Sequence, residues 1–394
     1  MKKIVVLSIW AAIFFLLGGC AATNKFSVVE YQQTMDAKFP PLAVFSKVPD
    51  GDFRQRCEAV NKESLLKQCS FNTIDYSQIY QELSQSGLFE SVHLANDAVP
   101  YQLLISSAMY DKTSAVELGQ AAVAGATLML APVNTSWEIH IDAALTWHGH
   151  LIRRYQYEIP FTSSVNLFSE HGSMDRDQAR AVVSRLIADF QKDEALSPGV
   201  LYRSLEASNY ETELHLPEAV GEYLANPLVM FRHPLYGAQA RYEHKQFQFD
   251  FVDVFVYPIP SWEWVDEKSV LARESLRVRK EMEYVEKEGQ WKDLSLSDDT
   301  WKRWRRADQQ VPVLELSGDF STVADEARYH TYAYLFLLKD KFVKVRASFT
   351  GEGRGKKDVE SFAREVLASI EVPDESRFMA RVRKMWRDER ASQP

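Results

Sequence analysis

The chain lacks the sequence signatures of common catalytic sites. A GxSxG elbow, an HExxH pair, a P-loop and a GxGxxG turn that opens a helix are all absent from its 394 residues. An excess of positive charge is also lacking, and the net charge of −9 disfavours attraction of the whole surface to nucleic acid or anionic lipid. These absences predict a non-catalytic protein with no cofactor, no metal and no nucleic-acid partner.

Long apolar runs are missing as well, except near the amino terminus. Lys2 and Lys3 precede the apolar stretch Ile4 to Leu16, which Leu17-Gly18-Gly19-Cys20 closes with small residues. Only 16 residues separate Lys3 from Cys20, whereas about 20 apolar residues are needed to span a bilayer. The pattern therefore predicts a secretion signal and not a transmembrane anchor.

Leu17-Gly18-Gly19-Cys20 resembles the lipobox of bacterial lipoproteins. The resemblance implies a cleaved signal peptide, residues 1–19, and acylation of Cys20 at the start of a lipid-anchored tether, residues 20–27. Because each buried methylene contributes about 0.8 kcal/mol, several acyl chains give a lasting attachment. Ala21 stands where that family carries an aspartate for inner-membrane retention, which implies an outer-membrane protein facing the periplasm.

Cysteine is scarce, and two of the three cysteines lie close together in the sequence. Cys57 and Cys69 are 12 residues apart, and the periplasm is oxidising, so we expect one disulfide that closes a small loop. Their spacing is not CxxC, and no histidine lies between Gly51 and Phe71. A catalytic cysteine pair or a zinc site is therefore disfavoured.

The length exceeds what one hydrophobic core usually organises, so we expect an α+β protein with two domains, each a mainly antiparallel sheet with packed helices. The first domain should span residues 28–196. Alternating and helical periodicities predict its elements, in order a strand, a helix capped by Asp75, two strands, a hairpin and a helix: 40–48, 76–86, 89–94, 101–110, 137–161 and 174–192. This order resembles that of curli-secretion and penicillin-binding-protein-activator lipoproteins.

The breaker Ser197-Pro198-Gly199 predicts a linker over residues 197–217 and a second domain over residues 218–373. Strands are expected at 228–231, 238–246, 249–259, 311–316, 331–338 and 342–349, with helices at 266–288 and 358–370. The strand 249–259 is apolar on both faces, so it should be central. The order of elements resembles the PsbP/Mog1 type of α-β-α sandwich, a class of binding and assembly modules.

Three internal stretches suggest functions but also have simpler explanations. Leu118 to Val133 is uncharged and rich in alanine, which suits a membrane or subunit contact or else a buried connection. The segment 301–306 mixes tryptophan with basic residues and suits a phosphate or glycan ligand, or else is an exposed turn whose tryptophans pack inward. His140, His148 and His150 share the hairpin, but His140 is about 26 Å along a strand from the turn, which disfavours a metal site.

The carboxyl-terminal segment, residues 374–394, predicts a basic amphipathic helix. Its apolar stripe is Phe378, Val382, Met385 and Trp386, and basic residues that include Arg381, Arg383 and Lys384 surround the stripe. Such a helix could contact anionic lipid or a partner, or it could pack on its own domain. The sequence leaves these alternatives open.

The most economical interpretation is a non-catalytic, outer-membrane-anchored periplasmic lipoprotein that serves as a binding or assembly module for an envelope protein partner. A periplasmic hydrolase acting on envelope polymer or lipid is one alternative, and it would require paired carboxylates in a deep pocket. A ring-forming secretion or transport component is another, and it would use Leu118 to Val133 as a contact.

Overall fold

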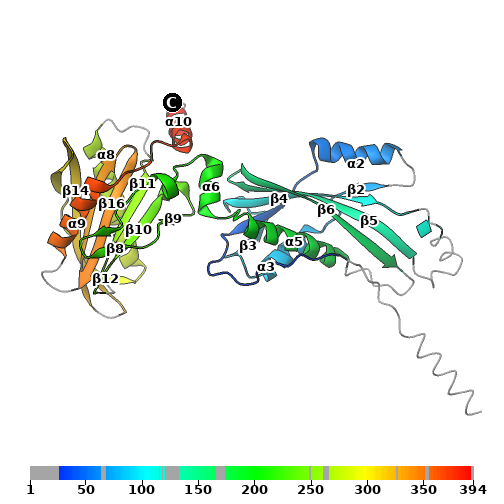
Figure 1. Ribbon diagram of the computed structural model, residues 1–394, viewed down its shortest axis with the longest axis horizontal. Coiled ribbons are helices and arrows are strands. Elements are labelled where there is room, and N and C mark those ends of the chain that lie inside the picture. The colour runs from blue at the N-terminus through cyan, green and yellow to red at the C-terminus, as the bar shows by residue number, and fades with distance from the viewer. Residues whose placement is uncertain are drawn as a thin grey trace, which may run out of the picture. The chain divides into compact units, whose positions relative to one another are not determined.

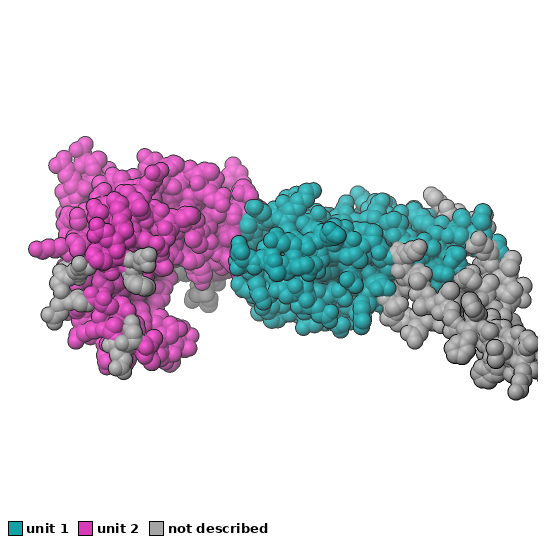
Figure 2. Space-filling model, turned by 60° about the horizontal axis from the view of Figure 1, so that its bottom comes forward, with its two compact units in different colours: residues 1–197 teal, residues 198–394 magenta. Residues whose placement is uncertain are grey.

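The computed structural model describes residues 26–63, 68–114, 116–117, 119, 133–165, 174–247, 250–260, 266–324, 327–350 and 355–391 (Figure 1). The proposed signal peptide, Cys20, most of the tether and residues 120–132 lie outside these ranges. The α+β class is confirmed, and the chain divides into two compact units, residues 1–197 and 198–394 (Figure 2). Among the described helices, none is both long enough and apolar enough to cross a membrane.

Unit 1 is built on a six-stranded sheet. Its order is β3-β1-β4-β5-β6 with β2 on β4, and β1 runs parallel to β3 and β4 while the other pairs are antiparallel. The elements are β1 (Leu42–Ser46), α2 (Gly51–Glu63), β2 (Cys69–Phe71), α3 (Tyr76–Gln85), β3 (Val92–Leu94), β4 (Tyr101–Asp111), β5 (Val133–Trp147), β6 (His150–Val165) and α5 (Met174–Lys192). Helix α5 has the predicted bounds.

The apolar residues of the long hairpin β5–β6 form the core of unit 1 with α5. Ile139 and Ile141 are buried and pair across the hairpin with Ile159 and Tyr157. Because strand residues alternate between faces, these side chains share one face of the sheet. The buried α5 residues, among them Phe190, pack there, and the rings of Tyr155 and Phe190 meet at 5.5 Å. Figure 1 shows α3 and α5 on this side of the sheet and α2 on the other.

The segment that carries Cys57 differs from the sequence prediction. We expected a small loop closed by the disulfide, but residues 51–63 form helix α2. Its inward residues Phe53 and Cys57 form a small apolar cluster with Cys69, Ala108 and Tyr110. The helix was missed because it is short of apolar residues, so its periodicity is weak. The cluster shows that α2 packs on the sheet through a narrow contact that includes the disulfide.

Unit 2 begins at Pro198, where the sequence predicted a linker. Residues 198–205 form α6, because proline is tolerated in the first turn of a helix, and α7 (Tyr210–Glu213) follows. The remaining elements are β7 (Ala219–Val220), β8 (Tyr223–Ala225), β9 (Val229–Met230), η1 (Pro234–Tyr236), β10 (Ala238–His244), β11 (Phe251–Pro258), α8 (Glu267–Lys287), β12 (Trp291–Leu296), β13 (Thr300–Arg306), β14 (Gln309–Thr322), β15 (Arg328–Leu338), β16 (Lys341–Thr350), α9 (Lys356–Ser369) and α10 (Arg377–Ala391).

These strands form a ten-stranded antiparallel sheet of order β12-β14-β15-β16-β11-β10-β8-β7, with β13 on β14 and β9 on β10. Strand β11 lies between β16 and β10, so its predicted interior place is confirmed. Residues 301–306 are not an exposed turn, because they form most of β13. Trp304 is buried there, whereas Trp301 is exposed.

Helices cover both faces of the unit 2 sheet. On one face, Val270, Leu271 and Met282 of α8 pack against apolar residues of β11, β14 and β15, among them Tyr257 and Leu335. The other face carries the alternate β11 residues, which include Val252 and Val254, and it is covered by α9. The unit is therefore an α-β-α sandwich.

Candidate functional site

The carboxyl-terminal helix α10 packs on unit 2 through Met379 and Arg383, which are both buried. Of the predicted stripe, Phe378, Val382 and Trp386 are partly buried and Met385 is 52% exposed. The face of α10 that points inward therefore differs from the predicted apolar stripe. The apolar pattern did not reveal it, because Arg383, a basic residue, lies at its centre.

Arg383 reaches a group of buried charges beneath α10. Its Nη2 donates to the Ile259 carbonyl at 2.7 Å and to the Asp340 carboxylate at 3.1 Å, and its Nη1 donates to Glu375. Asp340 also pairs with Lys341, which is completely buried. This ionic network explains why a strongly basic helix packs against its own domain.

Two further arginines of α10 also have partners within unit 2. Arg377 and Arg381 pair with the two carboxylate oxygens of Glu206, at 2.7 and 2.6 Å. Lys384 and Met385 are exposed. The surface of α10 that remains for a lipid or protein contact is therefore smaller than the sequence suggested.

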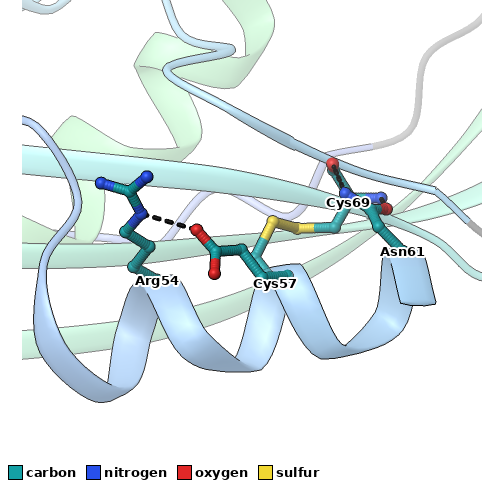
Figure 3. The surroundings of a disulfide bond; sticks show 5 residues. Arg54, Cys57, Asn61 and Cys69 are labelled. Carbon is teal, nitrogen blue, oxygen red and sulfur yellow. Dashed lines mark hydrogen bonds and ion pairs between the residues drawn. A yellow bond between two sulfur atoms is a disulfide. The ribbon is translucent and has the colours of Figure 1, made fainter. Parts of the chain in front are cut away.

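The disulfide between Cys57 and Cys69 joins α2 to β2 (Figure 3). The Cα atoms are 5.3 Å apart, within the range that disulfides require. Asn61, one turn beyond Cys57, donates to the Cys69 carbonyl at 2.9 Å and accepts from its amide at 2.7 Å. These contacts are structural, because they fix the end of α2 on the sheet.

His140 does not meet the other two histidines of its hairpin, but it lies between two carboxylates. Its Nε2 is 2.5 Å from Glu138 and its Nδ1 is 3.7 Å from Glu158. Lys112 also pairs with Glu138, at 3.3 Å. Burial raises the pKa of Glu138, but the hydrogen bonds with His140 and Lys112 outweigh it and hold this pKa below its usual value. Three such ligand atoms could hold a metal ion, but Lys112 already neutralises part of their charge.

A large candidate site is a pocket in unit 2, on the sheet face that α8 covers only in part. Beyond the end of the α8 core the face is hollowed into a cavity of about 730 Å³, within the range of small-molecule sites. Strands β10, β11, β12, β14, β15 and β16 contribute its walls. The cavity exists because one helix is too narrow to cover so wide a sheet.

Aromatic rings form one wall of this pocket. Trp291 stacks on Phe320 with ring centroids 3.9 Å apart, and Phe320 stacks on Tyr329 at 5.3 Å. Phe251 and Phe255 also line the cavity. The rings come from four strands that sequence periodicity could not align, so the sequence analysis missed them.

Arg346 of β16 lies among these rings and is partly buried. Its guanidinium carbon lies 5.5 Å from the centre of the Trp291 ring. Burial lowers the pKa of Arg346, because the charged form loses contact with water. Among the described residues, its guanidinium has no hydrogen bond and no ion pair. The arginine is thus a cation that lines a cavity and has no acceptor in the part of the chain that the structure describes.

Asp253 lies opposite Arg346 on the neighbouring strand, so it is the carboxylate that we would expect to pair with this arginine. However, Asp253 already accepts from Arg241 through both oxygens, at 2.9 and 3.0 Å, and from Gln239 at 2.8 Å. A charged residue within the apolar strand 249–259 was the one signal in the sequence that could have revealed this site.

Comparisons with solved structures show only distant likenesses of the fold. The chain resembles the solution structure of cyanobacterial PsbP (CyanoP) from Synechocystis sp. PCC 6803, with 16% identity and a TM-score of 0.28, over 42% of this chain and 89% of that one. It also aligns with the apo structure of the immunity protein TplEi of T6SS from Pseudomonas aeruginosa, with 8% identity and a TM-score of 0.22, over 70% and 93% of the two chains. No family model and no curated protein sequence matches.

Proposed function

We propose that this protein is a non-catalytic lipoprotein of the bacterial outer membrane, facing the periplasm, and that it binds a partner or ligand through unit 2. Leu17-Gly18-Gly19-Cys20 supports the lipid anchor, and the Cys57–Cys69 disulfide suits an oxidising compartment. The observation that carries the binding role is the pocket of unit 2 with Arg346 facing it.

Binding is favoured over hydrolysis by the polar groups of the pocket. A general base needs a carboxylate, histidine or similar group that can take up a proton. Two carboxylates, Asp250 and Asp253, line the cavity. Asp253 is engaged by Arg241 and Gln239, so the free pair that a two-carboxylate hydrolase requires is not present in the lining, and no histidine or cysteine is among the described residues there. Arginine stays protonated and serves to hold anions. The pocket is thus suited to recognition.

Crosslinking in intact cells tests this proposal. We expect the wild-type chain to give a defined crosslink to an envelope component, identified by mass spectrometry, and Cys20→Ala to lose both the acyl label and that crosslink. The matched control is Cys57→Ala/Cys69→Ala, which should keep the acyl label. A Cys20→Ala chain that is still acylated, or one that crosslinks like the wild type, would refute the proposal.

A further inference from the structure

We infer that the pocket of unit 2 binds a carboxylate carried on an aromatic or branched apolar body. The inference rests on the proposed function, because it names the class of ligand that the binding module takes. Three features carry it: the guanidinium of Arg346, which has no acceptor among the described residues, the near balance of the other charges in the lining, and the aromatic rings.

The first step is the need for an acceptor. Arg346 presents five N–H donors in a fixed plane, yet none of them has an acceptor among the described residues. Its neighbour Asp253 already accepts three hydrogen bonds from Arg241 and Gln239. A guanidinium removed from much of its water gains strongly from an ionised acceptor. A carboxylate matches the guanidinium fork with two parallel hydrogen bonds.

The second step limits the charge of the ligand. Lys344 lies two residues before Arg346 on the same sheet face, but it is only 9% exposed and sits over the rings of Phe255 and Tyr257, with Glu281 at 3.9 Å. It does not line the cavity, whereas Asp250 and Asp253 do. Arg241 also lines the cavity, but its charge is matched by Asp253. Arg346 is thus the lining cation without a partner among the described residues, and with Asp250 in the same lining a single negative charge is favoured over a phosphate dianion.

The third step concerns the body of the ligand. The stacked rings of Trp291, Phe320 and Tyr329 offer a flat apolar surface beside Arg346. An aromatic or branched group laid on this surface would bury apolar area while its carboxylate meets the guanidinium. Such a group could belong to a small acid or to the carboxyl terminus of a protein chain.

Calorimetry with the full chain in phosphatidylcholine nanodiscs tests the inference, with blank nanodiscs subtracted. The probes are 3-phenylpropionate, 3-phenylpropan-1-ol and 3-phenylpropylamine, which share a body and differ in charge. We expect the acid to bind at least about tenfold more tightly than the alcohol, and the amine to bind most weakly. Tighter binding of N-acetyl-phenylalanine than of 3-phenylpropionate would indicate a chain terminus, and the reverse would indicate a small acid.

Variants locate the effect. Arg346→Gln should remove the preference for the acid over the alcohol, and Arg346→Lys should restore only part of it because the fork is lost. Arg305→Gln is the matched control, since it removes the same charge from an exposed side chain elsewhere on the sheet. Thr350→Trp, at the exposed rim, should block all three probes.

The outcomes separate this inference from the proposed function. Equal affinity for acid and alcohol, or an Arg346→Gln chain that binds like the wild type, would overturn the ligand class. The ligand class would also be overturned, and the proposed function kept, if no probe binds while the crosslink that depends on Cys20 persists. If probe binding and that crosslink are both absent, the ligand class and the proposed function fail together.

Discussion

The two units differ in how a helix covers one face of the sheet: α2 covers it in unit 1 and α8 in unit 2. In unit 1, the 13-residue helix α2 packs through a small cluster and the Cys57–Cys69 disulfide. In unit 2, the 21-residue helix α8 packs through a broad set of apolar side chains, and no disulfide is found among its described residues.

The uncovered part of each face differs even more. In unit 1, Glu138 pairs with Lys112 and lies against His140 on the sheet surface. In unit 2, Arg346 has no such partner among the described residues and faces a cavity. A polar face whose charges are paired needs no ligand, whereas a partly buried charge without an acceptor marks a site where one is expected.

The largest loss of stability should follow from breaking the ionic network beneath α10 in unit 2. Asp340→Asn leaves Lys341 and Arg383 buried without their main counter-charge, so it should destabilise the unit by about 3 to 5 kcal/mol. Asp374→Asn is the control, because Asp374 is 87% exposed and its pair with Lys339 is screened by water, so its loss should have little effect. Urea unfolding measures both, and equal losses would contradict the network's role.

The disulfide of unit 1 should rank next. Cys57→Ala/Cys69→Ala should lower the free energy of unfolding by about 3 kcal/mol or less, since the disulfide closes a short loop. Because α2 otherwise rests on a small cluster, we expect faster amide hydrogen exchange in α2 and unchanged exchange in α5. Uniformly faster exchange across unit 1 would show that the disulfide supports the whole sheet and not one helix.

Lys344 should make unit 2 the more pH-sensitive of the two units. Burial lowers its pKa to about 8, from the ordinary lysine value of 10.5. The unfolded chain therefore binds more protons between these pH values, so the burial cost is present in full below pH 8 and is relieved as the pH rises to about 10.5. The gain is at most about 3 kcal/mol.

Lys344→Met should flatten this rise in stability between pH 8 and 10.5, as measured by urea unfolding at each pH. Lys339→Met, whose side chain is 54% exposed, serves as the control and should keep the wild-type slope. Parallel curves for the wild type and Lys344→Met would contradict the assignment.

The smallest losses of stability should come from removing the helix caps, and they should be similar in the two units. Asp75 caps α3 by accepting from the Ser77 amide, and Asp266 caps α8 by accepting from the amides of Lys268 and Ser269. Replacement of either aspartate by alanine should cost about 1 kcal/mol. Thermal unfolding of the two variants checks this, and a loss several times larger at one cap would show an additional role for that aspartate.

The sequence predicts elements well where local signals agree. Asp266 and the charged face of α8 mark that helix, and the alternation along 137–161 marks the hairpin. The sequence failed where a single local rule suggested the wrong structure. Residues 197–217 were taken as a linker although α6 and α7 lie there, and the mixed residues of β13 were taken as a turn because their alternation is irregular.

The candidate site was beyond sequence reasoning for a different reason. Arg346 becomes notable only when the strand register places it opposite Asp253 and when Arg241 is seen to engage that aspartate. Likewise, Arg383 lies in a basic run that suggested a surface, and only the position of Asp340 shows that it points inward. Such facts depend on contacts between distant segments.

The most direct test of the account is to identify what stays bound to the full chain when it is purified gently from membranes. Mass spectrometry would compare the wild type with Arg346→Gln and with Arg305→Gln. The account predicts a carboxylate-bearing species, small or the end of a protein, that the wild type and Arg305→Gln retain and Arg346→Gln loses. The same bound species in all three preparations would contradict the assignment of Arg346 as the group that holds the ligand.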